Sequence, residues 1–138
     1  MKICLDTNVV LDVVLRREPF FRESSQVMSM AELGQHIGVL CATTLTNMHY
    51  LCRRELGEFG ARQSVALCLQ SMELAPVSRS VFENALRSPM EDFEDAVLAY
   101  AAYQAGASAI VTRNLRDFSK SPVRAYTPEQ FLALPTTI

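Results

Sequence analysis

The sequence predicts an α/β domain in which a short, mostly parallel sheet of four or five strands lies between two layers of helices. Brief apolar segments alternate with longer stretches of helical periodicity, and this alternation is typical of βαβ units. The apolar segments are nearly continuous runs, as expected of strands that helices cover on both faces. The 138 residues contain no repeat and no linker, so we expect one domain spanning residues 1–138.

Each expected strand is a short apolar run that ends at a polar or turn-forming residue. The runs cover residues 2–5, 38–42, 74–77 and 109–112. Proline has no amide hydrogen to donate to a neighbouring strand, and Pro76 lies within the third run. That strand is therefore expected at an edge of the sheet.

The expected helices are segments with helical apolar spacing, bounded by caps, prolines and glycines. They cover residues 9–17, 19–34, 43–54, 61–72, 80–86 and 91–104, and a last one begins at residue 128. Short polar side chains accept hydrogen bonds from the free amides of a first turn, and they precede several of these segments. The expected caps are Thr7 or Asn8, Thr43 or Thr44, Ser80, and Thr127 with Gln130 as its capping-box partner.

Composition and charge restrict the classes of function. The net charge is −2, so the chain is not of the kind that coats nucleic acid by bulk positive charge. No apolar run approaches the length of a membrane span, and Asp6 interrupts the N-terminal segment before a signal peptide could form. The four cysteines lack C-x-x-C spacing, so we expect buried, reduced thiols in a cytoplasmic protein without a membrane partner.

The aspartates are confined to three short segments of the chain. They are Asp6 and Asp12, Asp92 and Asp95, and Asp117. Asp6 directly follows the first expected strand, and Asp117 follows the last one by a short loop. Residues that follow parallel strands collect at one edge of the sheet, where α/β proteins bind ligands. We therefore expect the three segments to converge there.

Converging carboxylates favour a metal site. They repel one another and raise each other's pKa unless a cation lies between them. Oxygen ligands without His or Cys suit Mg²⁺ or Mn²⁺, which clamp phosphates and activate water. Taken singly, Asp92 is explained by the helix dipole and Asp12 as a surface residue of its helix. Only the joint placement of the aspartates points to a metal.

Three segments together resemble the PIN-domain family. They are residues 5–12 (LDTNVVLD), 92–96 (DFEDA) and 111–118 (VTRNLRDF). Each motif is weak alone, but their order and spacing match the family from about residue 2 to residue 132. The Asp-Phe-Glu-Asp motif is similar to that of bacterial VapC-type toxins.

The resemblance implies a PIN-like fold and an endoribonuclease that depends on Mg²⁺ or Mn²⁺. It gives the metal-binding and catalytic roles to Asp6, Asp95 and Asp117. Asp92 becomes a further metal ligand that acts through water. The polar residues expected to order the pocket are Thr7, Asn8, Asn47, Thr112 and Asn114. Arg113 and Arg116 are the leading candidates for contacts with the RNA backbone, since phosphate contacts position a strand without reading its sequence. The further candidates are Arg16, Arg17, Arg53 and Arg54.

One position departs from the family pattern. Many members carry Glu on the helix after the second strand, in a Thr-Leu-x-Glu pattern, whereas this chain has Asn47 there. The neutral amide removes one negative charge, which lowers the expected metal affinity and leaves open whether one or two ions bind. The alternative function is therefore a catalytically weakened PIN-like module that binds RNA or regulates.

Protein partners are expected from the resemblance alone. VapC-type toxins imply a homodimer and a small antitoxin protein that reaches into the acidic pocket. Two other α/β classes lose support from the residues themselves. Asn8 stands where haloacid-dehalogenase phosphatases need a second acid, and no middle strand ends at the aspartate that receiver domains need.

Overall fold

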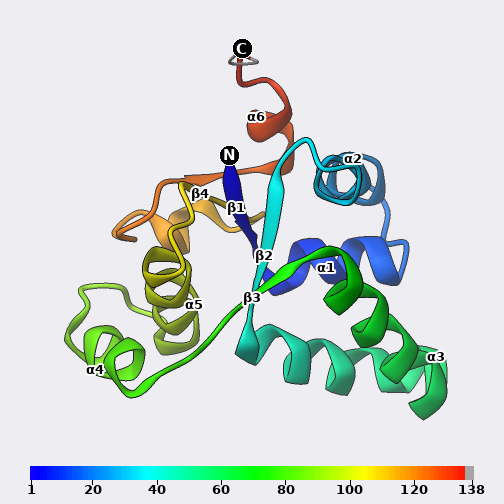
Figure 1. Ribbon diagram of the computed structural model, residues 1–138, viewed down its shortest axis with the longest axis horizontal. Coiled ribbons are helices and arrows are strands. Elements are labelled where there is room, and N and C mark those ends of the chain that lie inside the picture. Colours follow the sequence, from blue (N-terminus) through cyan, green and yellow to red (C-terminus); the bar gives the residue numbers. More distant parts are fainter. Residues whose placement is uncertain (136–138) are drawn as a thin grey trace.

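The computed structural model describes residues 1–135, which form a five-stranded sheet with helices on both faces (Figure 1). All neighbouring strands are parallel, and their order is β3-β2-β1-β4-β5. The strands are β1 (Lys2–Leu5), β2 (Ile37–Cys41), β3 (Glu73–Ala75), β4 (Ala109–Val111) and β5 (Ala125–Tyr126). The predicted α/β class with a parallel sheet is confirmed.

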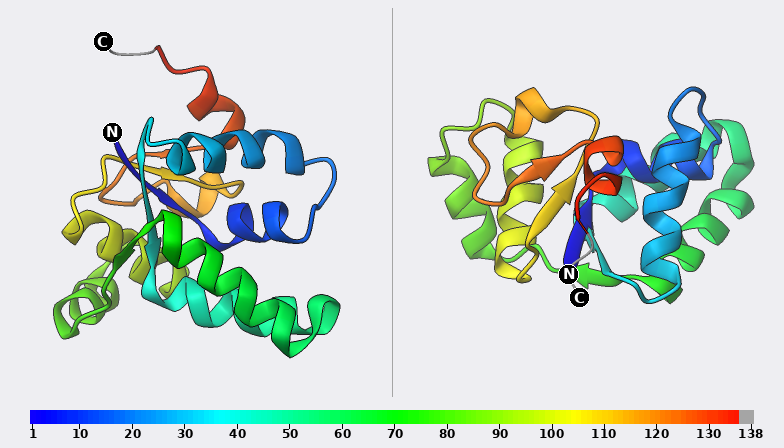
Figure 2. Two further views of the ribbon diagram at one scale, coloured as in Figure 1. Left: turned by 45° about the vertical axis from the view of Figure 1, so that its right-hand side comes forward. Right: turned by 90° about the horizontal axis from the view of Figure 1, so that it is seen from above.

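The helices form two groups, one on each side of the sheet (Figure 2). They are α1 (Thr7–Val14), α2 (Phe21–Glu32), α3 (Ala42–Ser71), α4 (Arg79–Arg87), α5 (Phe93–Gln104), the 3-10 helix η1 (Leu115–Phe118) and α6 (Pro128–Leu132). One hydrophobic core contains α4, α5 and η1, and the other contains α1, α2, α3 and α6. Cys4 of β1 enters the first core and Ile3 and Leu5 enter the second, because successive side chains of a strand point to opposite faces.

The strands agree with prediction except at one edge. The four predicted strands are present, and β3 lies at an edge of the sheet as expected, although it ends at Ala75 and Pro76 lies outside it. β5 was not predicted individually, because two residues are too short to give a recognisable apolar run. Its position depends on β4: the Ile110 amide donates to the Arg124 carbonyl oxygen at 2.9 Å, and the Thr112 amide donates to the Tyr126 carbonyl oxygen at 2.9 Å.

The caps differ from prediction at three helices. Asp6 rather than Thr7 or Asn8 caps α1, because β1 and α1 are joined without a loop and Asp6 Oδ1 accepts from the Thr7 amide at 2.8 Å. α3 and α4 start after Cys41 and Ser78 without any side-chain cap bond, so the threonines and the serine expected as caps lie inside these helices. The predicted capping box of α6 is confirmed.

α3 consists of two helical halves that meet at Gly57. This residue has φ +75° and ψ 172°, a backbone conformation that favours glycine, and the chain turns there (Figure 1). The interruption expected between the helices over residues 43–54 and 61–72 is thus confirmed, although it is confined to Gly57 and Gly60 already lies inside the second half. Glu58 joins the halves, since it accepts from His49 Nε2 at 2.6 Å and from Arg62 Nε at 2.8 Å.

The four cysteines are free and buried, as predicted. Burial raises the pKa of Cys68 to about 11 and raises that of Cys4 as well, so both thiols are neutral at pH 7. In residues 1–135 no helix combines the length and the hydropathy that a membrane crossing requires.

Candidate active site

The site begins where β1 and β4 end, because these strands are neighbours in the sheet. Asp6 follows β1 and is only 5% exposed. Its Oδ2 accepts a hydrogen bond from Thr112 Oγ1 at 2.8 Å, and its Oδ1 accepts from the Thr7 amide at 2.8 Å. Thr112 follows β4 directly. Each oxygen of Asp6 is therefore held by a donor, one from α1 and one from the end of β4.

The loop after β4 is tied to this carboxylate through Thr112. While its hydroxyl donates to Asp6, the same oxygen accepts from the Asn114 amide at 3.0 Å. The Asp117 amide then donates to the Asn114 carbonyl oxygen at 3.0 Å as η1 begins. Thr112 thus connects Asp6 to the segment that carries Asp117, and Asn114 takes part through its backbone.

The first turn of α5 brings the second group of acids. Asp92 caps this helix, and its Oδ1 accepts from the Asp95 amide at 2.9 Å. Asp95 is half-buried, and its pKa is raised to about 7, chiefly by burial and in addition by repulsion from neighbouring carboxylates. These carboxylates belong to Asp92, Asp6, Asp117 and Glu94. The three acidic segments therefore lie close enough to influence one another's protonation.

Asp6 is buried without a cationic partner. Burial raises the pKa of its carboxyl, and the hydrogen bonds from Thr112 and from the Thr7 amide oppose this. Within residues 1–135, Asp6 forms no ion pair with a lysine, arginine or histidine. Its negative charge is thus held directly only by neutral donors, with a weaker favourable effect from the Arg113 charge, and this is costly for a buried carboxylate.

A cleft of about 290 Å³, which we call the acid cleft, opens beside Asp6. It is lined by Asp6, Thr7, Asn8, Asn47, Tyr50, Leu51, Glu94 and Asp95. Five of these residues were predicted for the site. Asp92, Asp117 and Arg116 line a second cleft of about 380 Å³, which the Asp92–Asp95 hydrogen bond links to the first. The predicted acids thus occupy two linked clefts.

Glu94 is a site residue that the sequence patterns did not single out. It lines the acid cleft, and its Oε1 accepts from Asn47 Nδ2 at 2.8 Å. A carboxylate therefore lies beside the position where the family pattern has Glu and this chain has Asn. Its place inside the Asp-Phe-Glu-Asp motif was a usable signal, but most glutamates elsewhere in the chain are exposed to solvent.

Asp12 is not a surface residue, so that interpretation was wrong. Its side chain is fully buried, and Arg113 donates to both of its oxygens, from Nε at 2.6 Å and from Nη2 at 3.2 Å. The Arg113 guanidinium also lies 3.9 Å from the centre of the Phe20 ring. Burial of Asp12 follows from its position on the side of α1 that faces the core, beside the loop after β4. The guanidinium of Arg113 is therefore already bound within the fold, whereas Arg116, the other leading candidate for RNA contacts, is exposed.

The polar side chains of the acid cleft have the chemistry of a site for a hard cation, although they do not surround a single position as the ligands of a bound ion do. The polar groups that line it are carboxylates, hydroxyls and amides. Repulsion among the carboxylates contributes to the raised pKa of Asp95. In residues 1–135 no three side chains of Asp, Glu, His or Cys are placed to hold one metal ion together. Mg²⁺ retains several waters and needs only one or two direct carboxylates, so the residues fit such an ion.

A family model described as PIN domain matches residues 2–116. This range contains Asp6 and Asp95 and ends one residue before Asp117. A comparison with curated proteins finds no match.

Solved structures share the fold over most of the chain. A toxin–antitoxin complex from Klebsiella pneumoniae is 21% identical with a TM-score of 0.70, covering 91% of this chain and 97% of that chain. VapBC2 from Rickettsia felis, bound to a DNA fragment from its promoter, is 14% identical with a TM-score of 0.69 and coverages of 92% and 98%. VapC20 from Mycobacterium tuberculosis, described as a sarcin–ricin loop cleaving toxin, is 15% identical with a TM-score of 0.64 and coverages of 78% and 86%. At these identities the likeness establishes the fold.

Proposed function

The chain belongs to the PIN domain family, and we propose that it is a metal-dependent endoribonuclease whose reaction takes place in the acid cleft. One observation carries this proposal. Asp95 has its pKa raised to about 7 by burial and by carboxylates from all three acidic segments. A bound divalent cation relieves such repulsion, and oxygen donors without His or Cys select Mg²⁺ or Mn²⁺.

The residues of the two clefts have different roles in this proposal. Asp6, Asp95 and Asp117 would hold the cation, and Asp92 would act on it through water. Thr112 holds Asp6 in one orientation by its 2.8 Å hydrogen bond, and Thr7 and Asn8 line the cleft next to it. When bound, the cation supplies a water of lowered pKa and offsets negative charge on the phosphate.

Arg116 is the better placed of the two arginines proposed to contact RNA. It is exposed and lines the second cleft beside Asp117. Arg113, by contrast, is held by Asp12 and Phe20. A free guanidinium near the acids suits a phosphate of the strand that enters the acid cleft.

Cleavage of single-stranded RNA in Mg²⁺ or Mn²⁺ tests the proposal. We expect Asp6→Asn and Asp95→Asn each to lower the rate by about 100-fold or more, since losses of this order follow changes in a metal site. Glu83→Gln, which changes an exposed acid of α4 outside both clefts, is the matched control. Calorimetry with Mn²⁺ measures ion binding without substrate. Cleavage by Asp6→Asn at the wild-type rate would overturn the proposal.

A second candidate is a weakened module that binds RNA without cutting it efficiently. Asn47 favours it, because the residue is neutral and its amide is hydrogen-bonded to Glu94. Asn47→Glu restores the charge of the family pattern, and Asn47→Gln is its control. A gain in Mn²⁺ affinity and in cleavage rate for Asn47→Glu alone supports the weakened module. Efficient cleavage by the wild type argues against it.

An antitoxin protein and a homodimer are the protein partners that we propose, in a cytoplasmic setting. The similar fold of solved toxin–antitoxin complexes supports the first, and four free, buried cysteines suit a reducing compartment. Light scattering on the purified chain measures the oligomeric state. Co-expression with the product of a small adjacent gene tests the antitoxin, and its failure would leave the nuclease proposal intact.

A further inference from the structure

A third cleft, which we call the arginine cleft, has a volume of about 560 Å³. It is lined by Arg17, Tyr50, Leu51, Arg53, Arg54 and Glu55. Three arginines against one glutamate give a local charge of 3 − 1 = +2, although the whole chain carries −2. The chain therefore concentrates positive charge at one place on the surface of α3 and the turn after α1.

The arginines of this cleft are available to a ligand. In residues 1–135, neither Arg17 nor Arg54 forms an ion pair, and Arg53 only approaches Glu58 at 3.9 Å. The backbone amide of Arg17 donates to the Asp12 carbonyl oxygen at 2.9 Å, which fixes the turn that carries it. Guanidinium groups without carboxylate partners are the groups that bind phosphates most directly, since they donate two hydrogen bonds at once.

The arginine cleft adjoins the acid cleft. Tyr50 and Leu51 line both of them. Tyr50 is 72% exposed at this junction, so its ring is open to a ligand. A strand of nucleic acid that passes from one cleft to the other would meet arginines, then an aromatic ring, then carboxylates. Proteins that bind single strands combine a basic groove with aromatic rings on which bases stack.

From this arrangement we infer that the arginine cleft binds backbone phosphates of a single-stranded nucleic acid, with a base on Tyr50 and the strand continuing into the acid cleft. The inference rests on the proposed nuclease function, because that function explains why a strand would enter the acid cleft. A single strand is the fitting ligand because its bases are free to stack, whereas those of a duplex are stacked on one another.

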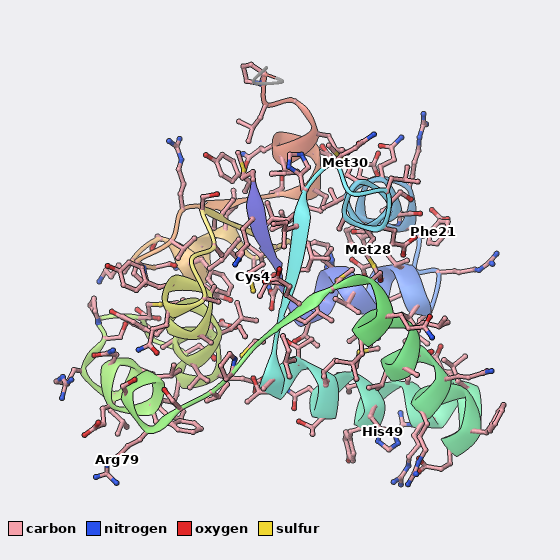
Figure 3. All side chains as sticks on the ribbon, viewed as in Figure 1. Cys4, Phe21, Met28, Met30, His49 and Arg79 are labelled. Carbon is pink, nitrogen blue, oxygen red and sulfur yellow. The ribbon has the colours of Figure 1, made fainter. Side chains whose placement is uncertain are left out.

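Fluorescence anisotropy with a labelled 12-nucleotide single-stranded RNA in EDTA tests the inference without cleavage. The variants are Arg53→Gln with Arg54→Gln, and Tyr50→Ala. The matched control is Arg79→Gln with Arg87→Gln, which removes the same charge from α4; Arg79 lies far from His49 of α3 (Figure 3). Affinity is measured from 0.05 to 0.5 M KCl, and circular dichroism verifies folding of each variant.

The salt slope is the slope of the logarithm of the binding constant against the logarithm of the salt concentration. We expect its magnitude to fall by about 1.4 in the double arginine variant, or roughly 0.7 per phosphate contact in a single strand. This loss corresponds to about 25-fold weaker binding at 0.1 M KCl, with the difference shrinking as salt rises. Tyr50→Ala should weaken binding by about 5-fold or more with an unchanged slope, because stacking releases no counterions. An unlabelled DNA strand of the same sequence should compete, since it presents the same phosphates.

Two results would overturn the inference. In one, the Arg53 and Arg54 variant binds RNA as the α4 control does. In the other, RNA fails to bind while an acidic peptide binds and depends on these arginines, which would make the cleft a protein contact. The proposed function is judged separately: arginine-dependent RNA binding without metal-dependent cleavage refutes the nuclease, and cleavage with unchanged binding by the arginine variant refutes only this inference.

Discussion

Asp6 and Asp12 lie six residues apart and are both buried, yet their surroundings are opposite. Asp12 is neutralised by Arg113, which donates to both of its oxygens. Asp6 has only neutral donors, Thr112 and the Thr7 amide, and burial raises the pKa of its carboxyl. The charge of Asp12 is neutralised within the fold, whereas the charge of Asp6 is left for a bound cation to neutralise.

This difference indicates which buried acid serves stability and which serves function. A buried charge with a good partner is a structural element, and its removal exposes the partner's unbalanced charge. A buried charge without a cation is costly to keep and is typical of a binding site. Substitutions at the two positions should therefore separate folding from activity.

The largest expected effect is the loss of folding stability in Arg113→Ala. Asp12 would remain fully buried without its partner, so the free energy of unfolding should fall by about 3–5 kcal/mol. Chemical denaturation measures this. The control replaces both partners with apolar residues, Asp12→Leu with Arg113→Met, and should recover most of the loss. If Arg113→Ala costs less than about 1 kcal/mol, Asp12 is not held as described.

Asp6→Asn should have the opposite profile, with activity lost and stability kept. The asparagine oxygen can still accept from Thr112, and although the hydrogen bond from the Thr7 amide is lost, the uncharged side chain avoids the cost of the buried carboxylate. We expect the free energy of unfolding at pH 8 without metal to be unchanged or increased. A loss as large as that of Arg113→Ala would show that Asp6 is a structural acid like Asp12.

Asp95 gives a pH dependence that extends the comparison. Its pKa is about 7 in the folded chain and near 3.9 when unfolded, so between these values the folded state holds a proton that the unfolded state has lost. Stability should therefore fall as pH rises from about 4 to about 7 and level off above. Asp95→Asn should reduce this slope, and Mn²⁺ should restore stability to the wild type at pH 8. Thermal unfolding across pH measures both, and an identical pH profile in the variant would contradict the assignment.

The smallest expected effect concerns an exposed charge cluster. Glu58 accepts from His49 and Arg62 across the turn at Gly57, and these contacts lower the pKa of its carboxyl. The group is solvated and its contacts are screened by water, so Glu58→Gln should change stability the least of these variants. Addition of 0.5 M salt to the wild type should mimic much of the change. A large loss of stability that does not depend on salt would contradict this, and would show that the cluster stabilises the fold as the Asp12–Arg113 pair does.

Much of the site was predictable because its parts are local. Asp6 ends a strand whose apolar run is evident, and Asp92 and Asp95 lie at the start of a helix with clear periodicity, although Asp92 caps this helix instead of lying in its first turn. The rule that residues after parallel strands collect at one sheet edge was enough to predict that the acidic segments converge. Glu94 was not predicted, since a glutamate on a helix is usually solvated and only its neighbours in space distinguish it. Arg17, Arg53 and Arg54 were among the candidates for RNA backbone contacts, but the sequence did not show that they line one cleft beside the acids.

The sequence alone determined the fold class, four of the five strands, the capping box of α6 and the acids that meet at the site. These features depend on hydrogen bonds and apolar spacing between residues close in the chain. Only the tertiary structure decided that Asp12 is buried and pairs with Arg113, 101 residues away, and that Asn47 meets Glu94. A contact between distant residues depends on how whole helices pack, and periodicity identifies a helix without identifying what its polar side chains will meet.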